Sequence, residues 1–195
     1  MPRRYAVLLL VGLVGCSGGK STEELIAEDV KARGLIKPPP QATPAPAASE
    51  FKPYDSPDGR FRVNFPGEPR FVDHGPSKPE HRTGMQSYIV LRQPRQYSIL
   101  RAENEEAPEP AAELQRLSDN YLRRSLDGEI TSSEDLSVGG RPAREIVVAD
   151  IEKTRRARFV VDGKDVYQVT VDVPEGEAGD ETDKAFVASF ELLKK

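Results

Sequence analysis

From residue 54 onward, short runs of alternating apolar and polar residues are separated by turn residues. In the first run Phe61, Val63 and Phe65 alternate with polar side chains. This period of two predicts a β-strand with one buried face. Comparable runs predict further strands at residues 71–72, 85–93, 96–103, 143–151, 154–161 and 165–173.

Two other stretches carry their apolar residues at helical spacing. Residues 111–126 have one apolar and one charged face, which predicts an amphipathic helix. Its apolar residues are Leu114, Leu117, Tyr121 and Leu122. A second helix is predicted close to the C-terminus, with Phe186, Phe190 and Leu193 as its buried stripe. The order of strands, helix, strands and helix predicts an α+β fold in which an antiparallel β-sheet is flanked by helices.

The register of the last two strands can also be predicted. The apolar set of the strand 154–161 includes Phe159, and that of the strand 165–173 begins at Tyr167. If both sets face one core, the connecting loop must have an odd length, because side chains alternate between the two faces. We therefore predict a three-residue loop, Val161-Asp162-Gly163, with Gly163 in the left-handed conformation.

The N-terminus has a pattern of another kind. Arg3 and Arg4 precede an apolar run over residues 6–14, which ends at Gly15 and Cys16. A basic start, an apolar run and a small residue at a cut site are typical of a secretory signal. The run is shorter than the roughly 20 residues that a transmembrane helix needs.

Cys16 is the only cysteine of the chain. With this cysteine at the cut site, the segment resembles the lipobox of bacterial lipoproteins. The resemblance implies a signal peptide at residues 1–15, cleavage between Gly15 and Cys16, and lipidation of Cys16. An ordinary signal peptide with an incidental cysteine is the alternative. By the same resemblance, Ser17 in place of an inner-membrane-retaining Asp favours the outer membrane over the inner membrane of a Gram-negative cell.

A spacer should separate this anchor from the folded part. Residues 16–36 are predicted to hold the lipidated N-terminus and a short helix, which begins at a capping box of Ser21 and Glu24. Residues 37–53 are rich in Pro and Ala, a composition that favours an extended, semi-stiff linker. The folded domain is then expected at residues 54–195.

Gly18-Gly19-Lys20-Ser21 resembles the end of a phosphate-binding loop. The full motif requires a glycine where this chain has Val14, so a nucleotide site is rejected. The 195 residues allow one domain and a tether. A formal net charge of −4 argues against general nucleic-acid binding. We expect no cofactor and no metal.

Three segments of the domain are similar to the PsbP-like fold family. They are Gly59 to Pro66 (GRFRVNFP), Asp165 to Val169 (DVYQV) and Phe186 to Phe190 (FVASF). The resemblance implies a central antiparallel sheet flanked by helices in an α/β/α sandwich. Because the known members bind or stabilise partner proteins and are not enzymes, it also implies a non-catalytic role.

Residues that could carry chemistry are few. His74 and His81 lie in one polar segment, but no tight spacing such as i, i+4 fixes them as zinc ligands. We interpret them as surface histidines. Within the expected domain at residues 54–195, no serine lies in a G-x-S-x-G motif, and no nucleophile is expected to pair with a histidine. The sequence therefore predicts no enzymatic activity.

The densest basic cluster is Arg155, Arg156 and Arg158. Alternation places Arg156 and Arg158 side by side, on the face opposite to Phe159. Two adjacent guanidinium groups could clamp a carboxylate or a phosphate, which makes this pair a possible binding patch. The alternative is a solvated strand face on which the arginines pair with nearby Glu and Asp.

Together these patterns predict a lipid-anchored cell-envelope protein. Its globular domain is expected to be a non-catalytic protein-binding or assembly module with an envelope protein as partner. A ligand-binding or sensor lipoprotein is the alternative, and a hydrolase acting on envelope material ranks below both.

Overall fold

The structure, a computed structural model, describes residues 50–76, 82–125, 127–151, 153–174 and 181–193. The predicted signal peptide, Cys16, the predicted short helix after it and most of the predicted spacer lie outside the described residues. The larger sheet has the strand order β3 (Arg70–Asp73), β4 (Arg82–Arg92), β5 (Arg95–Asn104), β9 (Asp165–Pro174), β8 (Lys153–Asp162), β7 (Arg141–Ala149) and β6 (Glu129–Val138). The smaller sheet has the order β1 (Lys52–Asp55), β2 (Phe61–Phe65) and β10 (Glu191–Leu192).

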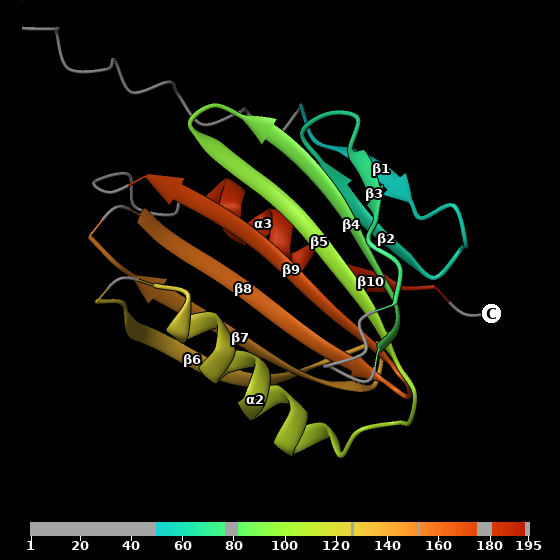
Figure 1. Ribbon diagram of the computed structural model, residues 1–195. Coiled ribbons are helices and arrows are strands. Elements are labelled where there is room, and N and C mark those ends of the chain that lie inside the picture. The colour runs from blue at the N-terminus through green and yellow to red at the C-terminus, as the bar shows by residue number, and fades with distance from the viewer. Residues whose placement is uncertain (1–49, 77–81, 126, 152, 175–180, 194–195) are drawn as a thin grey trace, which may run out of the picture. The chain divides into compact units, whose positions relative to one another are not determined.

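The helices lie on opposite faces of the larger sheet (Figure 1). Helix α2 (Pro110–Arg123) lies on β7 and β8, whereas α3 (Glu181–Ala188) lies on β8 and β9 from the other side, together with the smaller sheet. Every strand pairing is antiparallel. The predicted α+β fold, an antiparallel sheet flanked by helices, is confirmed. No helix among the described residues is long and apolar enough to cross a membrane.

Two cores form, one on each face of the larger sheet. The core on the α3 side is aromatic: Phe61 is fully buried and contacts Tyr88, Tyr167 and Phe190 with ring centroids 5.2, 6.0 and 5.6 Å away. The core under α2 is smaller and consists of Leu114, Leu117, Tyr121, Ile146, Val148, Ala157, Phe159, Val161 and Val166. Burial of such side chains stabilises the fold by about 1.5–3 kcal/mol each.

Helix α2 matches its prediction closely and has a defined start. The carboxylate of Glu109 accepts hydrogen bonds from the backbone amides of Ala111 and Ala112, and Pro110 occupies the first turn. The carboxylate satisfies amides that have no partner within the helix, and proline fits there because it has no amide hydrogen to lose.

The predicted loop between the last two long strands is wrong by one residue. The turn has two residues, Gly163 and Lys164, because Asp162 pairs with Asp165. Gly163 has the predicted positive φ, 62°, which suits the first central position of a two-residue hairpin turn. The prediction failed because it assumed one core, whereas Phe159 faces α2 and Tyr167 faces the opposite core.

Three strands were missed. Strand β6 is an edge strand whose residues are mostly exposed, so it lacks the apolar alternation of a half-buried strand. Strand β1 begins at Lys52, inside the stretch expected to be spacer, and pairs with β2. Strand β10 replaces the predicted end of the last helix.

Helix α3 is shorter than predicted and ends at Ala188. The hydroxyl of Ser189 donates to the carbonyl oxygen of Phe186 and accepts from the amide of Asn64 on β2. The chain then turns into β10, which pairs with β2. Phe190 is buried as expected, with 2% of its surface exposed, but from this turn rather than from a helix.

Candidate functional site

Among the described residues, nothing packs over a large part of the larger sheet on the α2 side. Helix α2 lies mainly on β7 and β8, and within the described ranges no helix or strand covers most of the same face of β4 and β5. We call this surface the open face. By register it consists of Met85, Ser87, Ile89 and Leu91 of β4, Gln96, Ser98 and Leu100 of β5, and Gln168 and Thr170 of β9.

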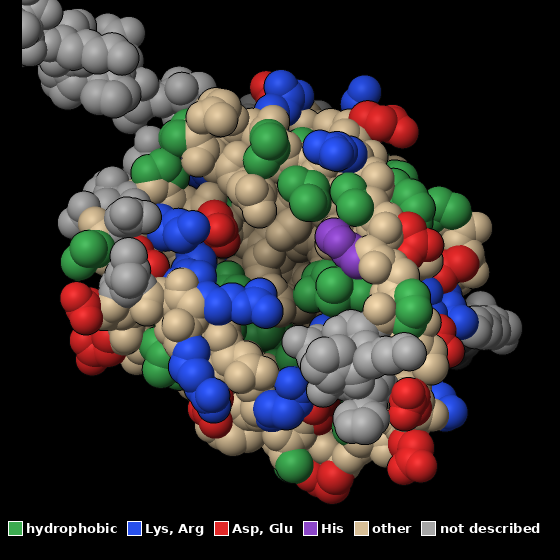
Figure 2. Space-filling view, in the orientation of Figure 1, with side chains coloured by type: hydrophobic (Ala, Val, Ile, Leu, Met, Phe, Trp, Pro, Cys, Tyr) green, Lys and Arg blue, Asp and Glu red, His purple; other side chains and the backbone are tan. Residues whose placement is uncertain are grey.

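The open face is concave. Figure 2 shows a hollow at its centre, with Lys and Arg side chains gathered along part of its margin. Where α2 meets the open face, a small pocket of about 40 Å³ includes Arg82, Arg116 and Arg124 in its lining. The described residues that line it include no Asp or Glu. Arg116 is held by Glu113 on its own helix, at 2.7 and 2.5 Å.

Polar side chains on the open face bond one another. The hydroxyls of Ser98 and Thr170, directly opposite across β5 and β9, lie 2.6 Å apart. His74 Nε2 lies 2.8 Å from the hydroxyl oxygen of Ser87. The prediction that no nucleophile pairs with a histidine is therefore wrong: β3 and β4 pair, which brings together two residues that are 13 positions apart in sequence.

The His74–Ser87 pair has the distance of a base and a nucleophile, but two features of a working pair are missing. Ser87 is only 8% exposed. Within the part of the chain that the structure describes, no carboxylate bonds the other ring nitrogen of His74. His81 lies outside the described residues, and those residues include no cluster of three metal-ligating side chains.

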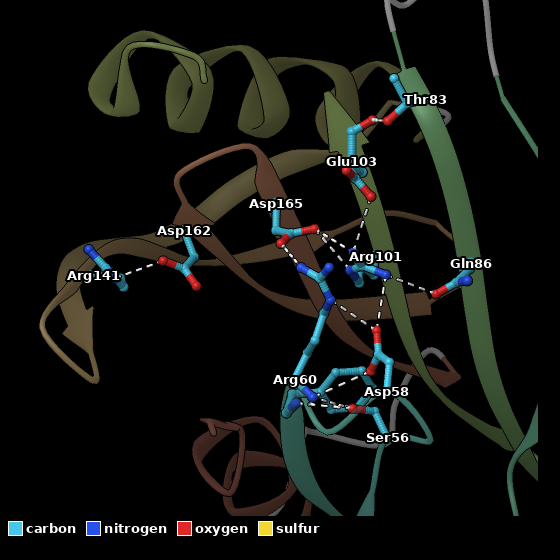
Figure 3. Close-up of polar contacts among 11 residues, drawn as sticks. Ser56, Asp58, Arg60, Thr83, Gln86, Arg101, Glu103, Arg141, Asp162 and Asp165 are labelled. Atoms are coloured by element: carbon cyan, nitrogen blue, oxygen red, sulfur yellow. Dashed lines mark hydrogen bonds and ion pairs between the residues drawn. The ribbon is translucent and has the colours of Figure 1, made fainter. Parts of the chain in front are cut away.

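A second polar cluster lies at the end of the sheet where β8 turns into β9 (Figure 3). Arg101 of β5 is 6% exposed and donates to Asp165 at 2.9 and 2.7 Å, to Asp58 at 3.2 Å and to Gln86 at 3.1 Å. Burial disfavours its charge, but the hydrogen bonds and the charge of Asp165 outweigh burial and raise the pKa of Arg101.

Arg60 joins this cluster from the start of β2. Its guanidinium contacts Asp165 as well as Asp58, the latter at 3.1 Å (Figure 3). Asp165 thus accepts from two arginines, Arg101 of β5 and Arg60 directly before β2. This arrangement compensates the carboxylate in a site where an unpaired charge would be costly, and it ties the smaller sheet to the larger one.

The arginines predicted as a binding patch lie elsewhere. Arg156 and Arg158 are on the face opposite to Phe159, and both contact Glu145 of β7, Arg158 at 2.7 Å. Their side chains are 18% and 14% exposed. Arg155 lies on the other face, under α2, over the ring of Tyr121 at 5.1 Å and 3.1 Å from Asp150.

Neither the open face nor the Arg101 cluster was identified from the sequence. The strands that build both features are far apart along the chain, and β5 and β9 become neighbours only through the sheet order. A weak signal exists for the cluster: Arg101 interrupts the series Tyr97 and Ile99 on the buried face of its strand, so a partner carboxylate would be expected.

Comparisons with known proteins give structural matches only. A scan against protein-family models finds no match, and a search of curated protein sequences finds none either. A search of solved structures finds cyanobacterial PsbP (CyanoP) from Synechocystis, 14% identical, with a TM-score of 0.46, over 82% of this chain and 99% of that chain.

Two further solved structures are similar at the same level. One is LpqN of Mycobacterium tuberculosis, involved in cell envelope biogenesis: 14% identity, TM-score 0.44, covering 74% of this chain and 91% of that chain. The other is the Ran-binding protein Mog1p of Saccharomyces cerevisiae, with 10% identity and a TM-score of 0.44 over 73% of this chain and 95% of that chain. At these identities and TM-scores, the similarity carries no information on what this chain binds.

Proposed function

We propose that this chain is a lipid-anchored cell-envelope protein whose folded part is a non-catalytic protein-binding module. The observation that carries the proposal is the open face. A sheet face normally buries its apolar side chains against another layer, yet Met85, Ile89 and Leu100 are only half-buried on this face.

The partner is a protein that presents acidic side chains. Three arginines line the pocket beside the open face; Arg116 is paired with Glu113, and Arg124 is exposed at the end of α2, although the whole chain carries a net charge of −4. Local positive charge on an acidic protein favours a partner of opposite local charge and orients its approach. The apolar floor then supplies the buried contact area.

The anchor belongs to the same proposal. Cys16, lipidated after cleavage behind Gly15, would hold the protein to a membrane, with the outer membrane favoured in a Gram-negative cell. The Pro-rich residues 37–53 would carry the domain, expected at 54–195, away from the bilayer. At about 3.1 Å per residue in an extended proline-rich chain, such a spacer reaches far enough for a membrane-fixed protein to find its partner.

Site-specific photo-crosslinking tests the docking surface. A photoreactive amino acid replaces Leu100 on the open face, or Ser133 on the exposed edge strand β6, in the full-length tagged protein in its own cells. We expect one protein to be crosslinked from position 100 and not from position 133. Crosslinking of the same protein from both positions, or of lipid alone from position 100, would overturn the proposal.

Two charge-reversal variants make the test more specific. Arg124→Glu reverses a charge in the pocket lining, and Arg123→Glu makes the same change one residue away, at another exposed arginine outside that lining. Both lie at the C-terminal end of α2, so the helix dipole affects them alike. We expect Arg124→Glu to weaken the crosslink about tenfold, equivalent to about 1.4 kcal/mol. An equal loss with Arg123→Glu would contradict the acidic-partner assignment.

The anchor has its own test. Cys16→Ser should abolish labelling with radioactive palmitate and shift the protein from the membrane fraction to the soluble envelope fraction. The open-face crosslink of the purified partner with the purified Cys16→Ser protein should persist. A Cys16→Ser protein that stays in the membrane fraction would disprove lipid anchoring without affecting the docking surface.

Hydrolysis is the second candidate function, because His74 and Ser87 lie at bonding distance. We expect Ser87 to be unreactive, since it is buried and no carboxylate among the described residues orients His74. A fluorophosphonate probe, which labels activated serines, should not label the full-length protein. Labelling that disappears in both Ser87→Ala and His74→Ala would establish a hydrolase instead.

A further inference from the structure

The turn between β8 and β9 holds two carboxylates directly opposite each other. Asp162 and Asp165 are the last paired residues before Gly163 and Lys164, so their side chains leave the same face of the hairpin. Like charges in directly opposite positions destabilise a sheet. Each carboxylate has its own counter-charge: Arg141 lies 2.7 Å from Asp162, and Arg60 contacts Asp165.

Both ion pairs line one pocket. The pocket has a volume of about 430 Å³, and its lining includes Arg60, Arg141, Asp162 and Asp165. Figure 3 shows the Arg141–Asp162 pair beside the Arg60–Asp165 pair, on the two sides of the hairpin turn. The remaining lining is mainly apolar and consists of Gly139, Tyr167, Leu192 and Leu193.

A ligand in this pocket can reach the charged groups. The side chains of Arg141, Asp162 and Arg60 are 56%, 31% and 24% exposed. Exposed ion pairs contribute little to stability because water screens them. Replacing one partner of such a pair by a charged group of a ligand therefore costs little free energy. Asp165 is 12% exposed and is fixed from behind by Arg101 at 2.7 Å, which holds one carboxylate in a constant position.

We propose that this pocket binds a small zwitterion, that is, a free amino acid or a dipeptide. The ammonium group lies between the carboxylates of Asp162 and Asp165, and the carboxylate accepts from the guanidinium groups of Arg141 and Arg60. A guanidinium fork matches a carboxylate in shape and charge. Two arginines and two aspartates sum to no net charge, which favours a neutral zwitterion over a simple anion or cation.

The site is separate from the open face. Asp162 and Asp165 lie at the end of the sheet, next to the smaller sheet, and the pocket lining shares no residue with the arginine pocket beside α2. A failure of the zwitterion proposal would therefore leave the proposed protein partner unaffected, and the reverse also holds.

The test uses the full-length chain with Cys16→Ser, labelled with ¹⁵N. The probes are the common free amino acids and alanyl-alanine at millimolar concentration, followed by amide chemical shifts. We expect saturable shifts at Gly139 and Gly163. N-acetyl-alanyl-alanine and alanyl-alanine amide each lack one of the two charges and should bind at least about tenfold more weakly than the dipeptide, or about 1.4 kcal/mol.

Substitutions of residues that line the pocket test whether the zwitterion binds there. Arg141→Gln and Asp162→Asn should each weaken binding about tenfold, and because their pair is exposed the fold should persist. Arg62→Gln is the matched control, since Arg62 forms a comparable ion pair with Asp55 at 2.6 Å, outside the pocket. It should bind as the parent does.

Several results would overturn the proposal. No saturable shift with any probe, in a protein whose spectrum is that of a folded chain, excludes a zwitterion site. Equal binding of the capped and uncapped dipeptides excludes recognition of both charges. Loss of binding in Arg62→Gln as large as in Arg141→Gln places the effect outside the pocket.

Discussion

The two halves of the larger sheet differ in how they are covered. At β7 and β8, α2 covers one face, and the other face carries Glu145, Arg156 and Arg158. At β4 and β5, the smaller sheet covers one face, and no described helix or strand covers most of the α2 side. The side chains differ accordingly. Under α2 lie Phe159 and Ile146, both 0% exposed, and the open face has half-buried residues such as Leu100.

By this difference, the half of the sheet under α2 contributes mainly to stability, and the open face is the part that we propose to bind a partner. Large side chains that interlock under α2 fix the helix on the sheet, since protein interiors are close-packed. The open face carries hydroxyls and apolar side chains that are only half-buried or exposed, so it can be altered with little loss of packing in the core. Substitutions in the two halves should therefore have effects of very different size.

The largest expected effect is from Phe159→Ala. Phe159 is fully buried and contacts the ring of Tyr121 at 5.8 Å between centroids. Removing a buried aromatic side chain costs its burial and leaves a cavity, about 3–5 kcal/mol in total. Urea denaturation followed by circular dichroism measures the loss. A change below about 1 kcal/mol would mean that α2 is not held by this core.

Asp165→Asn should have the next largest effect, because it leaves Arg101 without its main carboxylate at a position where only 7% of the arginine side chain is exposed. Breaking a buried ion pair from one side costs about 3 kcal/mol. Asp55→Asn makes the same change in an exposed pair with Arg62 and should not move the denaturation midpoint. Equal midpoints for the two variants would contradict a stabilising role of the Arg101 cluster.

Much of this organisation was predictable from periodicity. Phe61, Val63 and Phe65 define a strand because one face of β2 is buried, and Leu114, Leu117 and Tyr121 define α2 because one face of it meets the sheet. These are local patterns with a single buried side, so the period of two or of 3.6 residues appears directly in the sequence.

The failures have a common physical origin in contacts between distant segments. The turn after Asp162 was misplaced because both faces of the hairpin are buried, so apolar residues on neighbouring strands need not share a face. Strand β6 was missed because an exposed edge strand needs no apolar alternation. The His74–Ser87 pair and the Arg101–Asp165 pair depend on which strands are neighbours, and no local pattern specifies this.

A smaller effect is expected from Leu100→Ala on the open face. Leu100 is half-buried, so the substitution removes less apolar area than a core substitution and should cost no more than about 1 kcal/mol. Urea denaturation measures it against Phe159→Ala under identical conditions. A loss as large as that of Phe159→Ala would show that the open face is part of the core, and the distinction between the two halves would fail.

The smallest effect concerns the start of α2, the helix that distinguishes the two halves. Hydrogen bonds from the amides of Ala112 and Ala111 hold the pKa of Glu109 below its usual value of 4.5. A carboxyl with a lowered pKa in the folded state stabilises the fold above its unfolded pKa, and this contribution is lost as the pH falls through the lower, folded value. Acidification below pH 4.5 should therefore loosen the first turn of α2.

Glu109→Gln isolates this contribution, because the amide keeps an acceptor oxygen but does not titrate. Hydrogen exchange of the amides of Ala111 and Ala112 should be faster in the variant than in the parent at pH 7, and the two proteins should converge as the pH falls below 4.5. Exchange at β4 should be the same in both, since α2 makes its main contacts with β7 and β8. A difference spread over both halves would mean that the cap acts on global stability, and the two halves would then unfold as one unit.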